Sequence, residues 1–127
     1  MNKVFQLAKF YPPYRGGMES FVAELSEGVS AAGVPVEVIA SSAAREDAER
    51  VVNGVKVHEA GRWASILSQP ICPSYFKMVK AASSGILHLH APNPMADMAA
   101  ALVPAKTPMI VTYHSDVVRQ KLTGMLL

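Results

Sequence analysis

Two glycines near the N-terminus stand where a backbone can bind an anion. Gly16 and Gly17 directly precede a segment, from Met18 onward, whose apolar residues recur with helical spacing. Glycine has no side chain to obstruct a ligand, and the N–H groups and dipole at a helix start favour negative charge. The pair predicts a phosphate site, although two glycines also serve simply to turn a chain into a helix. Glu19 complements that helix start and is expected to be structural.

Histidines end two apolar segments further along the chain. His114 ends the run that begins at Pro108, and His90 ends the run from Ile86, with His88 two residues before it. Imidazole titrates near neutral pH and can donate or accept a proton. We expect His114 to contact a ligand and His90 to be a second contact. The competing interpretation is that each is an ordinary residue at the end of a strand.

The same histidines do not predict a metal site. His88 and His90 share one face of the expected strand, but no further His, Cys or Asp has the spacing of a ligand cluster. We therefore predict that the chain binds no metal and that His88 has a structural role.

Aromatic and polar side chains accompany these residues in three expected loops. Those of the first loop, which surrounds two prolines, can stack on or steer an acceptor molecule, or the loop can be a lid over the core. The residues expected to line the acceptor side are Tyr11, Tyr14, Arg15, Asn93, Ser115 and Asp116.

Two short apolar runs and one amphipathic segment are expected to position the glycine pair and the first loop. The run 4–8, flanked by two lysines, predicts a buried strand, and 34–40 predicts a second strand rich in β-branched residues. Between them, apolar residues from Met18 to Ala32 recur with the period of a helix, and Gly33 stands where a C-cap glycine belongs.

The remaining elements follow the same alternation. Asn53-Gly54 predicts a turn, and either a hairpin or a strand with a bent entry, after a surface connection or short helix over 41–50. Residues 62–74 carry no assignable pattern. Further on, the sequence predicts a helix over 75–82, a strand over 86–90, a helix from an Asn93 N-cap to about 103, a strand over 108–114 and a helix from 117.

This alternation of strands and helices predicts an α/β fold, a Rossmann-like three-layer α/β/α sandwich with a mainly parallel sheet. In such sheets, ligands bind beyond the carboxyl ends of the strands, near the point where the strand order reverses. The glycine pair and the two histidine segments all follow expected strands. We therefore expect them at one edge of the sheet.

Composition limits the possible functions. The chain has 127 residues, enough for one domain, and half of them are hydrophobic, enough for a packed core. Its net charge of +2 comes from scattered charges, so we predict no nucleic-acid partner. A single cysteine, Cys72, cannot form an internal disulfide and favours a reducing compartment, by default the cytoplasm. No apolar run reaches the length of about 18 residues that a membrane span needs.

Several common catalytic motifs are missing from the sequence. It has neither the G-x-G-x-x-G pattern of dinucleotide-binding enzymes nor a G-x-x-x-x-G-K phosphate loop. It also has no Ser-His-Asp order with a nucleophile elbow. These gaps weigh against a nicotinamide-dependent enzyme, a nucleoside triphosphatase and a serine hydrolase.

Three short motifs together resemble the glycosyltransferase group 1 family, the retaining glycosyltransferases of family four. They are Phe10-Tyr11-Pro12-Pro13 with Gly16-Gly17-Met18-Glu19, then the segment from Leu87 to Pro94, then Val111-Thr112-Tyr113-His114-Ser115-Asp116. The resemblance extends from Lys3 to the end of the chain. It implies the N-terminal domain of a two-domain GT-B architecture, whose enzyme moves a sugar from a nucleotide-sugar donor to a glycan or lipid-linked acceptor.

The resemblance also implies roles for individual residues. Gly16 and Gly17 lie beside the donor diphosphate, His114 approaches the donor sugar near the reacting carbon, and the rest of the edge shapes the acceptor site. No metal or cofactor is expected, because the family's C-terminal domain supplies an Arg and Lys pair and a Glu-x7-Glu motif. Glu19 and Glu27 have that spacing, but they lie on the exposed face of the first expected helix, in the wrong domain.

We therefore expect residues 1–127 to form one N-terminal domain without its C-terminal partner, and to be inactive or barely active alone. The last expected helix accumulates apolar residues up to Leu127 without a capping signal, which is typical of a truncated element. A non-catalytic α/β module that binds a sugar phosphate, or an accessory subunit, is the alternative. Peripheral contact with the inner face of a membrane is compatible with either function.

Overall fold

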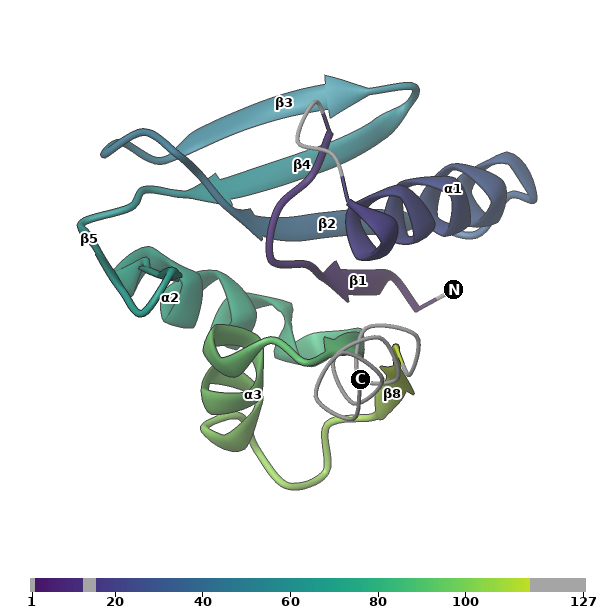
Figure 1. The fold of residues 1–127 in the computed structure, drawn as a ribbon. Helices are drawn as coiled ribbons and strands as arrows, with labels where there is room; N and C mark the ends of the chain where they lie inside the picture. Colours follow the sequence, from purple (N-terminus) through teal and green to yellow (C-terminus); the bar gives the residue numbers. More distant parts are fainter. Residues whose placement is uncertain (1, 13–15, 115–127) are drawn as a thin grey trace, which may run out of the picture.

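The computed structural model describes residues 2–12 and 16–114. Strands and helices alternate along most of this range (Figure 1). The elements are β1 (Val4–Leu7), α1 (Gly17–Ala31), β2 (Val36–Ser41), β3 (Ala48–Val52), β4 (Val55–Ala60), β5 (Ala64–Ile66), β6 (Gln69–Ile71), α2 (Pro73–Ala81), a 3-10 turn η1 (Ala82–Ser84), β7 (Ile86–Ala91), α3 (Pro94–Ala101) and β8 (Met109–Tyr113).

Six strands form the central sheet, in the order β3-β4-β2-β1-β7-β8. All neighbouring strands are parallel except β3, which runs antiparallel to β4. The strand order reverses at β1, which pairs with β2 on one side and with β7 on the other. The predicted Rossmann-like sandwich with a mainly parallel sheet is confirmed.

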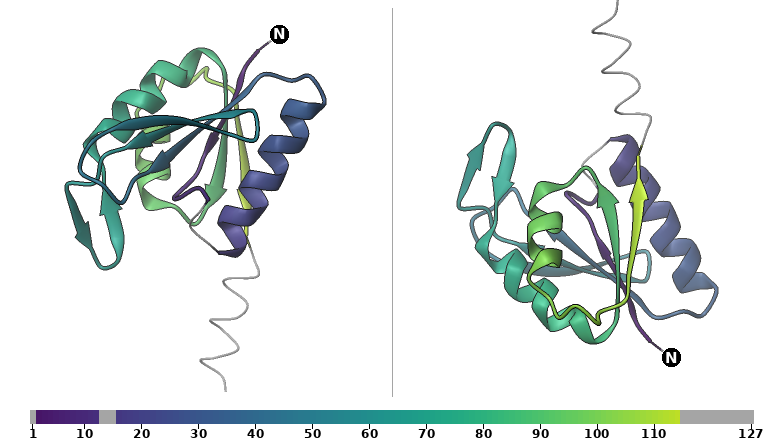
Figure 2. Two further views of the ribbon diagram at one scale, coloured as in Figure 1. Left: turned by 90° about the horizontal axis from the view of Figure 1, so that it is seen from above. Right: turned by 90° about the horizontal axis from the view of Figure 1, so that it is seen from below.

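Helices cover both faces of this sheet. Helix α1 lies on one face, and α2 and α3 lie on the other (Figure 1 and Figure 2). Because successive side chains of a strand point to opposite faces, Leu7 belongs to the core under α2 and α3, whereas Ala8 belongs to the core under α1. The end of β1 is therefore fixed from both sides, directly before the loop that leads into α1.

Local capping signals set the helix boundaries as predicted. At the start of α3, Oδ1 of Asn93 accepts a hydrogen bond from the backbone N–H of Ala96 at 3.4 Å, and Pro94 is the first helical residue. After α1, Gly33 has a φ of 91°, a conformation that glycine adopts without strain.

Two hairpins account for the segments that were ambiguous in the sequence. Asn53 and Gly54 form the turn between β3 and β4, so the hairpin alternative is correct, and β4 then pairs in parallel with β2. Part of the expected connection over 41–50 is strand, because β3 begins at Ala48. Residues 64–71 form the small β5–β6 hairpin, which stands apart from the central sheet (Figure 2).

The helix expected from Val117, and the uncapped end at Leu127, lie outside the described residues. Among the helices within 2–12 and 16–114, none combines the length and the apolar character that crossing a bilayer requires.

Candidate functional site

The carboxyl ends of β1, β7 and β8 meet where the strand order reverses. His90 is near the end of β7, and His114 directly follows β8, where its backbone N–H donates to the carbonyl oxygen of Ala91 at 3.0 Å. Helix α1 begins at Gly17, after the loop that follows β1. The structure therefore brings the two predicted histidines and the start of α1 to the edge at which such sheets bind ligands.

A chain of hydrogen bonds connects the two histidines with the middle of β1. Nδ1 of His90 lies 3.1 Å from Nε2 of His114, and Nε2 of His90 lies 2.6 Å from Oε1 of Gln6. The neighbouring His88 pairs with the hydroxyl of Thr112 at 2.7 Å, in agreement with a structural role. His90 and Gln6 are buried, and His114 is partly exposed, so His114 is the end of this chain that solvent reaches.

Phe21 completes the wall beside His114. Its ring stands edge-on to the His114 ring, with the centroids 5.0 Å apart, and also contacts His90 at 6.0 Å. The sequence places Phe21 on the apolar face of α1, but its side chain is 44% exposed. This residue therefore links the first turns of α1 to the histidines, a role that its position in a helical repeat does not reveal.

Burial controls the charge of the inner histidines. Burial, together with charge repulsion from the neighbouring His88 and His114, lowers the pKa of His90 to about 3. The pKa of His88 is also lowered, first by burial and then by His114. Both inner rings are therefore neutral at physiological pH.

The two glycines at the start of α1 have different surroundings. A Cβ atom at Gly16 would lie 2.2 Å from Oε2 of Glu19, so the Glu19 carboxylate folds back over Gly16. A Cβ atom at Gly17 would meet nothing within 4 Å. The Glu19 carboxylate therefore lies at the helix start, and the open space beside the glycine pair is at Gly17.

Comparison with known proteins shows which family the chain belongs to. The sequence model of Glycosyltransferase Family 4 matches residues 15–126. The chain belongs to this family. The resemblance carried by the three short motifs is confirmed.

Two curated relatives support the assignment to Glycosyltransferase Family 4. The chain is 29% identical over 114 residues to the O-antigen chain mannosyltransferase C of Escherichia coli. It is 30% identical over 118 residues to the D-rhamnosyltransferase WbpZ of Pseudomonas aeruginosa. Each match covers 88% of this chain but 31% of the relative, so the chain spans less than a third of the length of either protein.

Two of the expected acceptor-side residues of this family member lie inside the fold. Tyr11 is fully buried in the core under α1, which favours the lid interpretation of the first loop over direct contact with an acceptor. Asn93 is also buried, and its side-chain oxygen caps α3. The other four acceptor-side positions, Tyr14, Arg15, Ser115 and Asp116, lie outside the described residues.

Arg50 anchors the beginning of the first loop. Its guanidinium donates to the carbonyl oxygens of Tyr11, at 3.5 Å, and of Pro12, and it pairs with Glu59 at 2.9 Å. Sequence reasoning did not find this residue, because Arg50 and Pro12 are 38 positions apart and no local pattern links them. The pairing shows that β3 and β4 hold the backbone leading to the start of α1.

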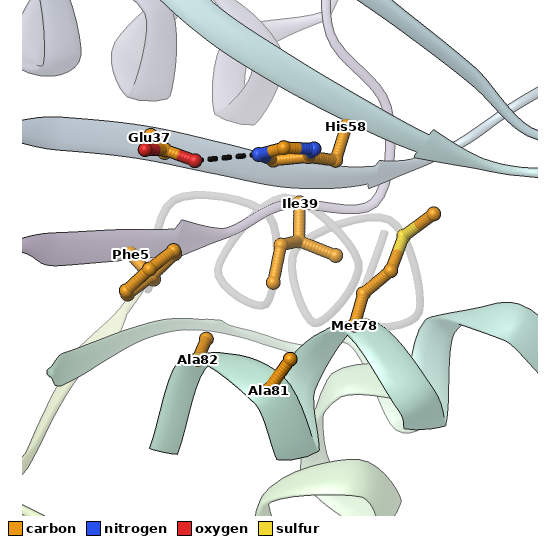
Figure 3. Close-up of a pocket in the computed structure, with 7 residues that line it drawn as sticks. All are labelled: Phe5, Glu37, Ile39, His58, Met78, Ala81 and Ala82. Carbon is orange, nitrogen blue, oxygen red and sulfur yellow. Dashed lines mark hydrogen bonds and ion pairs between the residues drawn. The ribbon is translucent and has the colours of Figure 1, made fainter. Parts of the chain in front are cut away.

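A mostly apolar cavity lies elsewhere in the fold. It measures about 280 Å³, lies between the sheet and α2, and is lined by Phe5, Glu37, Ile39, His58, Met78, Ala81 and Ala82 (Figure 3). Burial alone would raise the pKa of Glu37, but hydrogen bonds from Lys3 and His58 outweigh it and lower that pKa. The cavity is on the face opposite α1, toward the amino ends of β1 and β2, and is separate from the histidine site.

No set of three or more His, Cys, Asp or Glu side chains within residues 2–12 and 16–114 is arranged to hold a metal ion. The expectation that the chain needs no metal therefore stays a prediction.

Proposed function

We propose that this chain is the acceptor-side, N-terminal half of a retaining glycosyltransferase that moves a sugar from a nucleotide-sugar donor to a glycan or lipid-linked acceptor. The observation that carries the proposal is the placement of His114 beside the start of α1, at the reversal of strand order. A donor bound there has its diphosphate near backbone N–H groups and its sugar near an imidazole.

The chemistry assigns a task to each group. The bond between the anomeric carbon and the donor phosphate breaks, a bond to the acceptor oxygen forms, and the proton of the acceptor hydroxyl passes to the leaving diphosphate. Negative charge grows on the leaving diphosphate, which the backbone N–H groups of the first turn of α1, beginning at Gly17, stabilise. His114 holds the donor sugar by hydrogen bonding to a hydroxyl, which places the anomeric carbon for attack.

Glu19 restricts where the phosphate can bind. Its carboxylate covers Gly16 and repels an anion there, which favours Gly17 as the contact. The remaining charge on the leaving group is offset by basic residues from the half of the enzyme that lies beyond this chain, so the proposed reaction uses neither metal nor cofactor. Residues 1–127 alone are therefore inactive or nearly so.

The names of the relatives suggest the donor sugar. One is a mannosyltransferase and the other a D-rhamnosyltransferase. We accordingly propose a hexose or deoxyhexose as the transferred sugar, for a polysaccharide of the cell envelope.

A titration tests this function directly. The chain is titrated by calorimetry with nucleoside diphosphates and with nucleotide sugars, and compared with Gly17→Val and His114→Ala. We expect weak binding that Gly17→Val abolishes and that His114→Ala weakens for nucleotide sugars only. The control is Gly28→Val, because Gly28 is also an open glycine of α1 but lies away from its N-terminus. Absence of binding to every nucleotide contradicts the proposal and favours an accessory module.

We also propose that the enzyme works in the cytoplasm against the inner face of the membrane. The support is the β5–β6 hairpin, where Trp63, Ile66 and Leu67 are all largely exposed. The chain carries Arg62, Lys77 and Lys80 between residues 60 and 96 and no acidic residue in that range, which suits an anionic surface.

Vesicle sedimentation tests the membrane contact. Wild-type chain should sediment with vesicles containing phosphatidylglycerol, and Leu67→Asn should sediment less. Val51→Thr, a change of another exposed apolar residue on β3, is the control and should behave like wild type. Equal sedimentation of Leu67→Asn and wild type would contradict a role for the hairpin.

A further inference from the structure

Two of the three residues in the Gln6–His90–His114 hydrogen-bond network, His90 and Gln6, lie out of reach of a substrate. His90 and Gln6 are buried, and they come from β7 and β1, two neighbouring strands. Gln6 pairs in register with His88, and its side chain reaches His90 on the same face of the sheet. The buried Gln6 amide and the buried His90 imidazole can therefore determine which nitrogen of the partly exposed His114 ring carries its hydrogen.

The donor and acceptor atoms of this network determine the direction of each hydrogen bond. Oε1 of Gln6 is a carbonyl oxygen and only accepts, so Nε2 of His90 must carry the hydrogen of the 2.6 Å contact. A neutral imidazole has one N–H group, which leaves Nδ1 of His90 as an acceptor. Nε2 of His114, 3.1 Å away, must therefore donate.

These hydrogen bonds also determine the tautomer of the partly exposed His114 ring. Neutral His114 then has its hydrogen on Nε2, and its Nδ1 carries a lone pair that can accept a hydrogen bond. No hydrogen bond among residues 2–12 and 16–114 uses that Nδ1. The edge-on contact with Phe21 supports the ring from a second side.

We propose that Gln6 and His90 are positioning residues that hold His114 in the Nε2–H tautomer and present its Nδ1 as a hydrogen-bond acceptor to a sugar hydroxyl. The inference rests on the proposed function for the identity of the ligand, but not for the tautomer. It makes the site selective for a hydroxyl donor, and it makes a group that offers only an acceptor, such as a carbonyl, a poor ligand at this point.

Because His90 is neutral, the hydrogen bond between His114 and His90 cannot reverse its direction. If His90 were protonated, both its nitrogens would donate, and Nε2 of His114 would have to accept. Burial lowers the pKa of His90 to about 3 and prevents this at physiological pH. Gln6 serves the same purpose by providing an acceptor where an apolar residue would leave the His90 tautomer free to change.

Nitrogen-15 NMR of the 127-residue chain labelled at histidine tests the proposal without any ligand. In the wild-type chain, we expect His114 to show a protonated Nε2 and an unprotonated Nδ1. In Gln6→Leu, which removes the acceptor but keeps an apolar side chain of similar size, we expect a mixture of the two tautomers. Thr112→Val is the matched control, because it removes the hydroxyl partner of His88 but leaves the Gln6–His90–His114 contacts in place, and it should keep the single tautomer.

The possible outcomes separate this proposal from the function. A protonated Nδ1 in wild-type His114, or an unchanged tautomer in Gln6→Leu, overturns the positioning role. The wild-type spectrum decides the first point even if a variant does not fold. Addition of GDP-mannose should then shift the Nδ1 resonance of His114. A correct tautomer with no shift and no binding of other nucleotide sugars would leave the positioning role intact and count against the proposed function.

Discussion

Leu67 occupies in the β5–β6 hairpin the same left-handed turn position that Asn53 occupies in the β3–β4 hairpin. The φ angles are 50° and 49°, and the next residues, Ser68 and Gly54, have φ angles of 65° and 83°. Both connections have two residues, and such turns favour Asn-Gly. The β3–β4 hairpin uses the residues that suit this geometry, whereas the β5–β6 hairpin keeps an apolar side chain that is 92% exposed.

Replacing Leu67-Ser68 by Asn-Gly should therefore stabilise the protein. A left-handed conformation costs an ordinary L-residue about 1–2 kcal/mol, so we expect a gain of roughly 1 kcal/mol in the free energy of unfolding. Urea denaturation measures it. The reciprocal variant Asn53→Leu with Gly54→Ser should lose a similar amount, and equal stabilities of all three proteins would contradict the turn argument.

Removal of the Tyr75 hydroxyl should destabilise the fold. This fully buried side chain of α2 donates to the carbonyl oxygen of Ala8 at 2.9 Å and lies 3.4 Å from that of Ile39. Tyr75→Phe leaves buried carbonyls without that donor, so we expect a loss of about 1–2 kcal/mol in denaturant unfolding. Tyr113→Phe changes an exposed tyrosine in the same way and should alter stability by less than about 0.5 kcal/mol.

Stability should fall as the pH drops below neutral, because His90 cannot accept a proton in the fold. Its pKa is about 3 in the folded chain, against 6.5 ordinarily, so the unfolded chain binds the proton first. The contribution is complete above pH 6.5 and is lost as the pH falls from 6.5 toward 3, with a slope of up to about 1.4 kcal/mol per pH unit.

Unfolding by urea at neutral pH and at about pH 5 measures this slope. The His90→Asn variant should have a shallower slope than wild type, because it lacks the buried imidazole. His88, whose pKa is also lowered, contributes to the pH dependence of both proteins in the same direction. Equal slopes of stability against pH in the two proteins would show that the pKa of His90 is not lowered in the fold.

Gly16 and Glu19 should be energetically coupled. A methyl group at Gly16 would collide with the Glu19 carboxylate and displace it from the helix start. We expect Gly16→Ala to cost roughly 0.5–1 kcal/mol more in the wild-type background than in Glu19→Ala, as measured by a double-mutant cycle. Gly17→Ala, where the added methyl meets open space, should show no coupling to Glu19. Additive effects at Gly16 and Glu19 would contradict the contact.

Local signals explain how much of the fold could be predicted. Apolar periodicity and caps identified α1 and α3, because those features depend on residues within a few positions of each other. The β5–β6 hairpin escaped prediction because its turn lacks the Asn-Gly signal that marked the β3–β4 hairpin. Strand order could not be derived from any of these patterns.

Only the residues of the site that lie at the carboxyl edge of the sheet could be predicted from the sequence. His114 ends one expected strand and Gly17 follows the loop after another, so their common edge could be inferred from the fold class alone. The contact between Gln6 and His90 joins residues 84 positions apart and depends on β1 and β7 being neighbours. Phe21 and Arg50 were missed for the same reason, since their partners lie far away in the sequence.

The anchoring of the first loop has a consequence for how the sequence of that loop can change. Arg50 and Tyr75 hold the segment after β1 through the main-chain carbonyls of Ala8, Tyr11 and Pro12. Carbonyl groups are common to all residue types, so substitutions along this segment need not disturb its attachment. Substitutions can therefore accumulate in the loop, while the two anchors, Arg50 and Tyr75, preserve its course.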